Sequence, residues 1–403
     1  MIDVAVIGAG AAGISAAREA RKRGHTAVIL EASKRVGGRT HTIDWQGCAL
    51  DLGATWLHSA GRNPLGRLAE QLGFDIDRSP VPWRNQYRNL GYSPQEQAES
   101  WAAMEAFAKR LRENPPASDR ASDALEPGGE WNGFLEALNG YLDGTSLRNN
   151  SAADFMAYWD TSENSNWRLP KGYGALVGAL AKDLDVRTGC AIRQVEWSKS
   201  GVRLISQQGV VDAAHAIIAV STNVLASGEI VFSPSLDDRL HAVAQLPLGR
   251  VEKLFLGLDD PEAAPENAHL VGNPRSAETG SYMLRPLGMP VVEGFFGGDW
   301  LNGVGAEDLL AKTREELGAL LGAEFARDLR SIAHSDWKRE PFIRGSYSYA
   351  RPGQHGARVA LRAPVDGPIA FAGEACSDRD FATVHGAWES GQAAVAQLFG
   401  DLT

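Results

Sequence analysis

The chain has 403 residues, of which 44% are hydrophobic and 22% charged, so its composition is that of an ordinary globular protein with a buried core. Forty Lys and Arg against 50 Asp and Glu give a formal net charge of −10, which argues against nucleic acid or an anionic membrane as a partner. Cys48, Cys190 and Cys376 form no CxxC spacing, and the nine histidines show no metal-ligand spacing, so we expect neither a disulfide framework nor a metal site. No targeting segment or membrane-length apolar run is visible, so we expect a cytoplasmic protein.

The first 31 residues predict a strand–helix–strand unit. Residues 2–7 are a short apolar run, residues 11–23 carry small residues on one face and charges on the other, and residues 26–31 form a second apolar run. This order predicts the start of an α/β, Rossmann-like parallel sheet.

A dinucleotide fingerprint joins the first strand to the first helix. Gly8, Gly10 and Gly13 match GxGxxG, and Glu31 follows the last glycine by 18 residues, near the spacing of a ribose-binding acid. A carboxylate there disfavours NADP and leaves NAD and FAD. A second glycine pair with Arg39, a paired donor for a pyrophosphate, favours FAD.

The remaining elements are predicted from periodicity and breakers. Residues 65–114 and 131–159 look helical, and the Pro- and Asp-rich stretch 115–129 between them predicts a long exposed loop. Short strands are expected within 184–220 and at 251–258, 281–284, 291–296 and 369–372, with helices at 306–321 and 385–399.

Six segments together resemble the flavin-containing amine oxidases, a superfamily that includes monoamine and polyamine oxidases. They are the fingerprint, Gly37-Gly38-Arg39 and the stretches 51–56, 169–174, 372–375 and 384–387, the last closest to the polyamine oxidases. The resemblance implies a Rossmann-like FAD-binding domain built from residues 1–73, 169–245 and 345–403. It also implies a discontinuous α+β substrate-binding domain built from 74–168 and 246–344.

The same resemblance implies which residues hold the cofactor. Those expected to bind FAD are Gly8, Gly10, Ala12, Gly13, Glu31, Arg39, Gly53, Ala54, Thr55, Trp56, Ile192, Glu374 and Val384. Monoamine oxidases attach the flavin through a cysteine before the cage tyrosine, but here that stretch reads Gly345-Ser346-Tyr347. We therefore expect FAD to be bound non-covalently.

The resemblance also implies two catalytic residues. Lys253 would hold a water against flavin N5, and Tyr347 would form one wall of an aromatic cage, with Thr383 where monoamine oxidases keep a second tyrosine. The substrate pocket is expected to include Trp56, His58, Trp300, Trp337, Thr383 and His385. From the residues alone, Lys253 can also be a solvent-facing strand lysine, Trp300 a core residue and His385 a residue that serves only the fold.

The activity implied is FAD-dependent oxidation of an aliphatic, polyamine-like amine. A hydride equivalent passes to flavin N5, the imine hydrolyses to an aldehyde, and oxygen is the expected acceptor, giving hydrogen peroxide. One alternative is an L-amino-acid oxidase, in which Arg84, Arg285 or Arg344 would pair with the substrate carboxylate. Another is a flavin-binding protein without turnover. The oligomeric state is not readable from the sequence.

Overall fold

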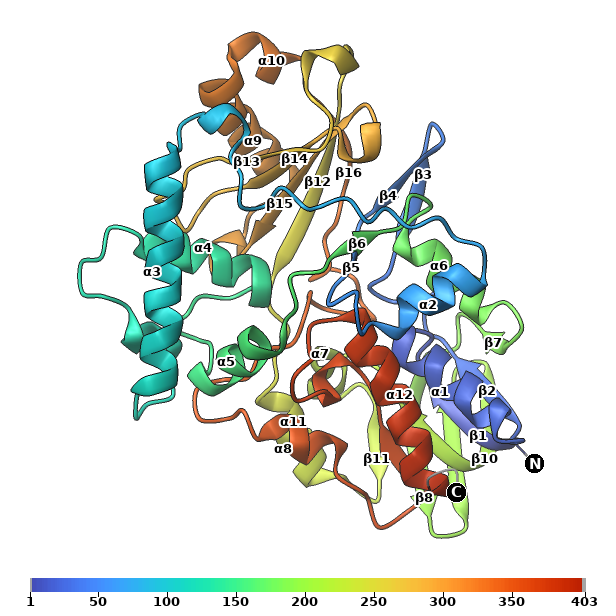
Figure 1. Ribbon diagram of the computed structural model, residues 1–403. Helices are drawn as coiled ribbons and strands as arrows, with labels where there is room; N and C mark the ends of the chain where they lie inside the picture. Colours follow the sequence, from blue (N-terminus) through green and yellow to red (C-terminus); the bar gives the residue numbers. More distant parts are fainter. Residues whose placement is uncertain (1, 401–403) are drawn as a thin grey trace.

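The computed structural model describes residues 2–400, and most of its strands fall into two large sheets (Figure 1). The larger sheet has eight strands in the order β11–β8–β9–β10–β1–β2–β7, with β17 paired to β10. Their bounds are β1 Ile2–Ile7, β2 Ala27–Leu30, β7 Asp185–Arg187, β8 Ile192–Ser198, β9 Gly201–Ser206, β10 Gly209–Ile218, β11 Val231–Ser233 and β17 Ile369–Phe371.

Strand β10 joins two kinds of pairing in this sheet. Residues 209–213 pair antiparallel with β9, while residues 213–218 run parallel to β1, and β17 is parallel to β10 on the same stretch. This change from antiparallel to parallel pairing agrees with the sequence. The first half of β10 follows a tight hairpin turn, and its second half, Ala216-Ile217-Ile218, is buried. The carboxyl ends of β1, β2 and β10 therefore meet at one edge, where an open α/β sheet binds ligands.

Helix α1 (Ala11–Lys22) covers one face of this sheet and packs along α12 (Val384–Phe399), so the first and the last helix lie side by side (Figure 1). The other helices near this sheet are α2 Pro64–Gln71, α6 Tyr173–Ala181, α7 Thr222–Ala226, α8 Asp237–Ala244 and α11 Ala357–Arg362. Two small two-stranded sheets, β3 (Thr42–Trp45) with β4 (Cys48–Asp51) and β5 (Trp56–Leu57) with β6 (Trp167–Arg168), lie toward the second sheet.

The second sheet is antiparallel, in the order β13–β14–β15–β12–β16. Its strands are β12 Val251–Gly257, β13 Ala268–Val271, β14 Ser281–Leu284, β15 Val291–Gly297 and β16 Arg330–His334. One face, with Leu254, Tyr282 and Phe296, packs on α9 (Ala306–Leu321), and α10 (Ala323–Asp328) follows. Because side chains alternate along a strand, Lys253 and Phe295 project from the opposite face.

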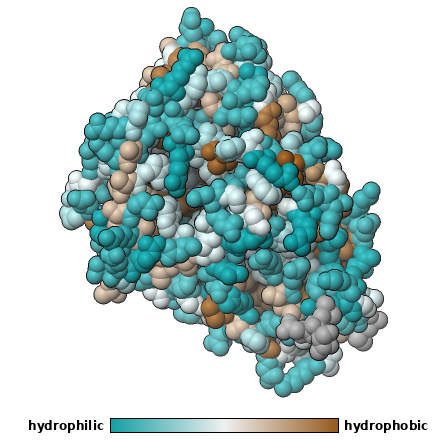
Figure 2. Space-filling model, viewed as in Figure 1, coloured by the Kyte–Doolittle hydropathy of each residue, from teal (hydrophilic) through white to brown (hydrophobic). Residues whose placement is uncertain are grey.

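Helices α3 (Pro94–Glu113), α4 (Asn132–Asp143) and α5 (Ala152–Thr161) form a separate layer beside the second sheet (Figure 1). They share a buried cluster that includes Phe107, Phe134 and Phe155. The outer face of the molecule is mostly hydrophilic, with hydrophobic side chains scattered over it in small groups (Figure 2). Within residues 2–400, no helix combines the length and the apolar character of a bilayer span.

The α/β prediction is confirmed, and several element predictions match closely. The helix at 306–321 has the predicted bounds, and the last helix begins at Val384, one residue earlier than predicted. The prediction of helix across 65–114 is wrong in its middle. The helix α2 ends at Gln71, the chain passes Pro80 and Pro82 without regular structure apart from one short turn, and α3 begins only at Pro94, with Ser93 as its cap.

Two further predictions need correction. The stretch 115–129 is not wholly exposed, because a short 3₁₀ turn at Ala121–Ala124 buries both of its alanines. The hairpin β3–β4 and the outer strands β13 and β16 were not expected, since these are short and partly polar runs whose pairing depends on distant partners. The domain boundaries given above stay a prediction.

Arg358 provides a test of the packing between α5 and the rest of the chain. Its guanidinium is fully buried and makes a two-pronged contact to Asp154 of α5, with both distances 2.7 Å. Arg358→Met removes the cation and leaves the buried Asp154 carboxylate without a fixed positive charge beside it, so it should lower the free energy of unfolding by about 3–5 kcal/mol in urea titrations. Arg203→Met, which breaks an exposed pair with Asp212, is the control and should cost less than about 1 kcal/mol. Equal losses in both variants would contradict this account of the buried pair.

Candidate functional site

One cavity extends from the carboxyl ends of β1 and β2 to the inner face of the second sheet. Its volume is about 460 Å³, whereas a cavity for a single water has roughly 10–15 Å³. It is therefore a ligand site rather than a packing defect. Of the residues predicted to bind FAD, those on its wall are Gly8, Gly10, Ala12, Glu31, Arg39, Gly53, Ala54, Thr55, Trp56, Ile192, Glu374 and Val384.

The fingerprint glycines are arranged as predicted. A Cβ on Gly13 would lie 2.0 Å from Gly8 O, so glycine is required for the close approach of α1 to β1. A Cβ on Gly10 would meet no protein atom within 4 Å, although this residue lines the cavity. The space in front of Gly10 is thus open toward the first turn of α1, where a pyrophosphate binds in such folds. Gly13 allows α1 to pack closely on β1 and thereby holds this pyrophosphate-binding turn, here called the cradle, in place.

Glu31 lies at the end of β2 with its carboxylate buried against the fingerprint loop. Oε2 accepts a hydrogen bond from Ala9 N at 2.6 Å, and Oε1 accepts one from Ser33 N at 2.8 Å. The carboxylate is thereby fixed on the cavity wall, in the position where a ribose acceptor is expected.

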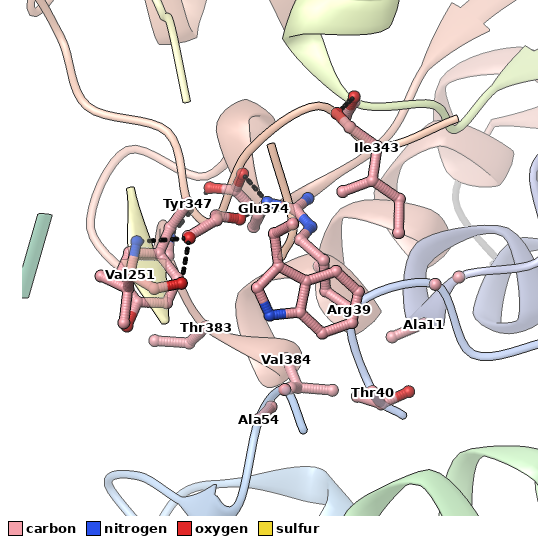
Figure 3. A pocket seen from close by; sticks show the side chains of 18 of the residues that line it. Ala11, Arg39, Thr40, Ala54, Val251, Ile343, Tyr347, Glu374, Thr383 and Val384 are labelled. Carbon is pink, nitrogen blue, oxygen red and sulfur yellow. Dashed lines mark hydrogen bonds and ion pairs between the residues drawn. The ribbon is translucent and has the colours of Figure 1, made fainter. Parts of the chain in front are cut away.

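Arg39 and Glu374 meet across the middle of the cavity (Figure 3). Arg39 Nη1 lies 2.9 Å from Glu374 Oε1, and Ser348 Oγ and Ala382 N donate to the other carboxylate oxygen. Burial acts to raise the pKa of Glu374, but Arg39 and Arg358 outweigh it, so the net shift is downward and the carboxylate stays ionised. Part of the Arg39 guanidinium remains accessible from the cavity, where it can donate hydrogen bonds to an anion.

Ser346 occupies the position of a flavin-attaching cysteine. Its hydroxyl accepts from Val251 N at 2.7 Å and donates to Val251 O at 2.9 Å, as the dashed lines at Val251 show in Figure 3. The side chain joins β12 to the segment before Tyr347 and carries no thiol. The residues present therefore fit a dinucleotide that is held without a covalent bond.

Lys253 projects from β12 into the cavity and is buried, so it is not the solvent-facing strand lysine that the sequence left open. Its Nζ lies 2.8 Å from Glu293 Oε1, donates to Asp51 O at 3.0 Å and donates to Thr55 Oγ1. The ammonium group thus faces three protein acceptors at the junction between the cofactor half and the second sheet.

Aromatic side chains form the rest of this wall. Trp56, Trp337 and Tyr347 line the cavity as predicted, and Tyr347 Oη donates to Tyr141 O at 3.3 Å. Trp83 meets Trp56 edge-on at 4.8 Å between ring centroids. Several wall residues were not predicted, namely Trp83, Trp101, Phe134, Tyr141, His269, Met283, Glu293 and Phe295. Glu293 was the one with a readable signal, because an acid within the apolar run 291–296 is unusual.

His58 and Thr383 also line the cavity, each with one polar group already engaged. His58 Nδ1 lies 2.7 Å from Asn166 Oδ1, so this nitrogen donates and Nε2 is the acceptor. Burial lowers the pKa of His58 to about 4, which keeps the ring neutral near pH 7. Thr383 Oγ1 caps α12 by accepting from Gly386 N, leaving its methyl group for the wall.

Trp300 and His385 do not belong to the described wall of the cavity, so their placement in a substrate pocket is corrected. Trp300 donates from Nε1 to Gly297 O at 2.9 Å and packs on Phe296, in the core beneath the second sheet. His385 is 1% exposed, and its Nε2 lies 3.2 Å from Asp380 Oδ1. Since His385 follows Val384 by one residue on α12, it points about 100° away from it.

Comparisons with known proteins agree with this geometry. The sequence matches a family model described as "Flavin containing amine oxidoreductase" over residues 11–399. It is 28% identical to "Polyamine oxidase 2" of Arabidopsis thaliana over 470 residues, covering 99% of this chain and 90% of that protein. Among solved structures, putrescine oxidase bound to putrescine has a TM-score of 0.82 at 20% identity, covering 99% of both chains. Cyclohexylamine oxidase from Brevibacterium oxydans IH-35A has a TM-score of 0.83 at 21% identity, covering 98% of both. At these identities the structural likeness shows the fold.

The position of Glu31 predicts a loss of cofactor on substitution. Glu31→Ala removes the acceptor expected for the ribose and should weaken FAD binding by about 1.5–3 kcal/mol, roughly 10- to 100-fold, by titration of the apoprotein. Glu70→Ala, an exposed acid on α2, is the control and should bind FAD as the parent does. Unchanged FAD affinity in Glu31→Ala would remove the ribose role from this residue.

Proposed function

Since the chain belongs to the flavin-containing amine oxidoreductases, we propose that it oxidises an aliphatic amine to an imine, which water hydrolyses to an aldehyde. Oxygen is proposed as the electron acceptor, with hydrogen peroxide as its product. The observation that carries this proposal is the buried Lys253, which lies where an aromatic cavity meets the dinucleotide cradle.

The cofactor is FAD, which when bound takes the hydride equivalent that the amine loses. We assign Glu31 and Ile192 to its adenosine end, and Gly10, Ala12 and Arg39 to the pyrophosphate. The segment Gly53–Trp56, with Glu374 and Val384, would hold the flavin half. All of these residues line one continuous cavity, which supports the assignment.

The protein's own task is to bind the amine in its neutral form. A free alkylamine resembles lysine, with a pKa of about 10.4, and an apolar environment disfavours its cation. The walls formed by Trp56, Tyr347 and Phe295 provide that environment, and the neutral His58 presents an acceptor nitrogen rather than a charge. We propose that His58 orients the amine and that these rings exclude water.

Lys253 is proposed as the residue that fixes a water beside the flavin. Its three partners hold the ammonium group at the cavity wall, and Thr55, one of them, itself lines the cavity. The three acceptors take up the three N–H donors of the ammonium group, so a water would be held in place of one of them or by Thr55, whose hydroxyl accepts from Lys253 and can donate in turn.

The alternative of an L-amino-acid oxidase requires an arginine for the substrate carboxylate, and none of the three candidates lines the described cavity. Arg84 is exposed over Trp101, Arg285 pairs with Glu266, and Arg344 pairs with Glu229. The alternative of a flavin-binding protein without turnover leaves the buried Lys253 without a purpose. Both are therefore less favoured than an amine oxidase.

Non-covalent binding predicts complete release of the cofactor. Acid precipitation of the purified yellow protein should leave all flavin in the supernatant, because Ser346 provides no thioether. Yellow colour that stays with the washed precipitate would show a covalent bond and overturn this assignment.

Substitution of Lys253 tests the proposed chemistry. Lys253→Met keeps the apolar stem and removes the donor, so either flavin reduction by amine or reoxidation by oxygen should slow by about 100-fold, equal to ~2.7 kcal/mol of barrier. Stopped-flow absorbance separates the two half-reactions. Lys199→Met, at an exposed lysine, is the matched control and should leave both rates unchanged. Both rates of Lys253→Met within twofold of the parent would leave this lysine without a catalytic role.

A further inference from the structure

The part of the cavity beyond Lys253 is here called the substrate half. It is lined by the inner face of β12–β15, by α4 and Tyr158, and by Trp56, His58, Trp83 and Trp101. Strand register places Lys253, Phe295, Ser281 and Val271 in one row across the sheet, and Glu293 beside Met283 in the next. This half is where the body of a substrate must lie.

The charged side chains on the described wall of the substrate half are Lys253 and Glu293. They form an ion pair of 2.8 Å, with side chains 6% and 13% exposed, so their charges cancel inside the cavity. Lys253 engages Oε1 of Glu293, and a second cation drawn to this carboxylate would lie close to the Lys253 ammonium group, whose positive charge opposes it.

Several neutral polar groups on this wall already have hydrogen-bond partners, whereas Nε2 of His58 is left as an acceptor. Tyr141 Oη donates to Thr279 O at 3.0 Å, and His269 Nε2 lies 2.8 Å from Ser281 Oγ. Tyr347 Oη is bonded to the backbone of α4. The surface that remains for contact with a substrate is therefore mainly carbon, from Phe134, Leu138 and Phe295.

Two tryptophans of the wall already carry a cation. The guanidinium of Arg84 lies 4.4 Å from the ring centroid of Trp101, and that of Arg168 lies 4.9 Å from that of Trp56. Arg168 is paired with Asp77 at 2.7 Å and Arg84 is exposed, so each guanidinium acts mainly by occupying one face of its ring, where a ligand's ammonium group would otherwise bind. The rings are therefore apolar walls here rather than a cage for a cation.

We propose that the substrate is a monoamine with an apolar body and that the Lys253–Glu293 pair excludes amines with a second charge. A distal ammonium of a diamine or polyamine would be buried without a partner, and the carboxylate of an amino acid would be as well. This inference rests on the proposed amine oxidation and narrows its substrate class, against the polyamine-like expectation from the C-terminal motif.

A matched pair of amines tests it on the FAD-loaded enzyme. At pH 7.5, anaerobic flavin reduction by hexylamine and by 1,6-diaminohexane is followed over a range of concentrations. The rate constant of flavin reduction divided by the dissociation constant of the amine should be at least 100-fold higher for hexylamine than for the diamine. A diamine that reaches within threefold of the monoamine would overturn the proposal.

A designed charge change gives a second test. Met283→Glu places a carboxylate opposite Glu293 and shifts the charge of the substrate half by −1. It should therefore lower the ratio of hexylamine to diamine efficiency, and so narrow the preference for the monoamine, at least tenfold. Met283→Gln has the same shape without the charge and should not narrow it. Equal narrowing in both variants would show that size, and not charge, sets the preference.

Binding without turnover separates this inference from the proposed function. Calorimetry compares 2-methylhexan-2-amine with 2,5-dimethylhexane-2,5-diamine, neither of which has an α C–H bond to oxidise, and only the monoamine should bind. If it binds while hexylamine leaves the flavin oxidised, the proposed oxidation fails and the monoamine site stands. If the diamine binds as tightly, the monoamine site fails whatever the enzyme oxidises.

Discussion

Four charges of alternating sign, three of them buried, hold the site together. Arg39 lies 2.9 Å from Glu374, Ser348 bonds both Glu374 and Arg358, and Arg358 clasps Asp154. Glu374, Arg358 and Asp154 are removed from water, and burial of each charge is offset only by its neighbours, so this series of contacts fixes four segments that are far apart in sequence. Asp154 stands one helical turn before Tyr158, which lines the cavity. The same interactions that orient the pyrophosphate cradle thereby place a wall of the substrate half.

The cavity has two electrostatic halves because of how its charges are paired. In the cofactor half, Arg39 keeps part of its guanidinium free toward an anion, while Glu31 presents a fixed acceptor. In the substrate half, Lys253 and Glu293 cancel each other and little else is charged. A polyanionic cofactor and a neutral amine can therefore share one continuous space, since each meets the environment that suits its charge.

The sequence predicted those parts of the fold and site that depend on neighbours along the chain. The fingerprint turn, the helix at 306–321 and the serine in place of a cysteine are of this kind. The partners of Lys253 could not be predicted from the sequence, because Asp51 and Glu293 come from distant strands whose pairing is decided by the whole sheet. The prediction that His385 lines the substrate pocket was wrong for a different reason. A motif fixes the position of the backbone but not which side of the helix faces the cavity.

The titration of the cavity's own groups shows what it does to an incoming amine. Burial lowers the pKa of both His58 and His269 from the ordinary 6.5 to about 4, because the imidazolium form loses its water there. An alkylammonium loses the same water in the same place. Near pH 7.4 its deprotonation costs about 4 kcal/mol in solution, from the three units between that pH and ~10.4. A cavity that disfavours cations admits the neutral amine in preference to the ammonium, and the interactions that the neutral amine makes there offset this cost. Within residues 2–400 the wall of the substrate half presents no strong base, which is consistent with an amine that leaves its proton in the solvent as it binds.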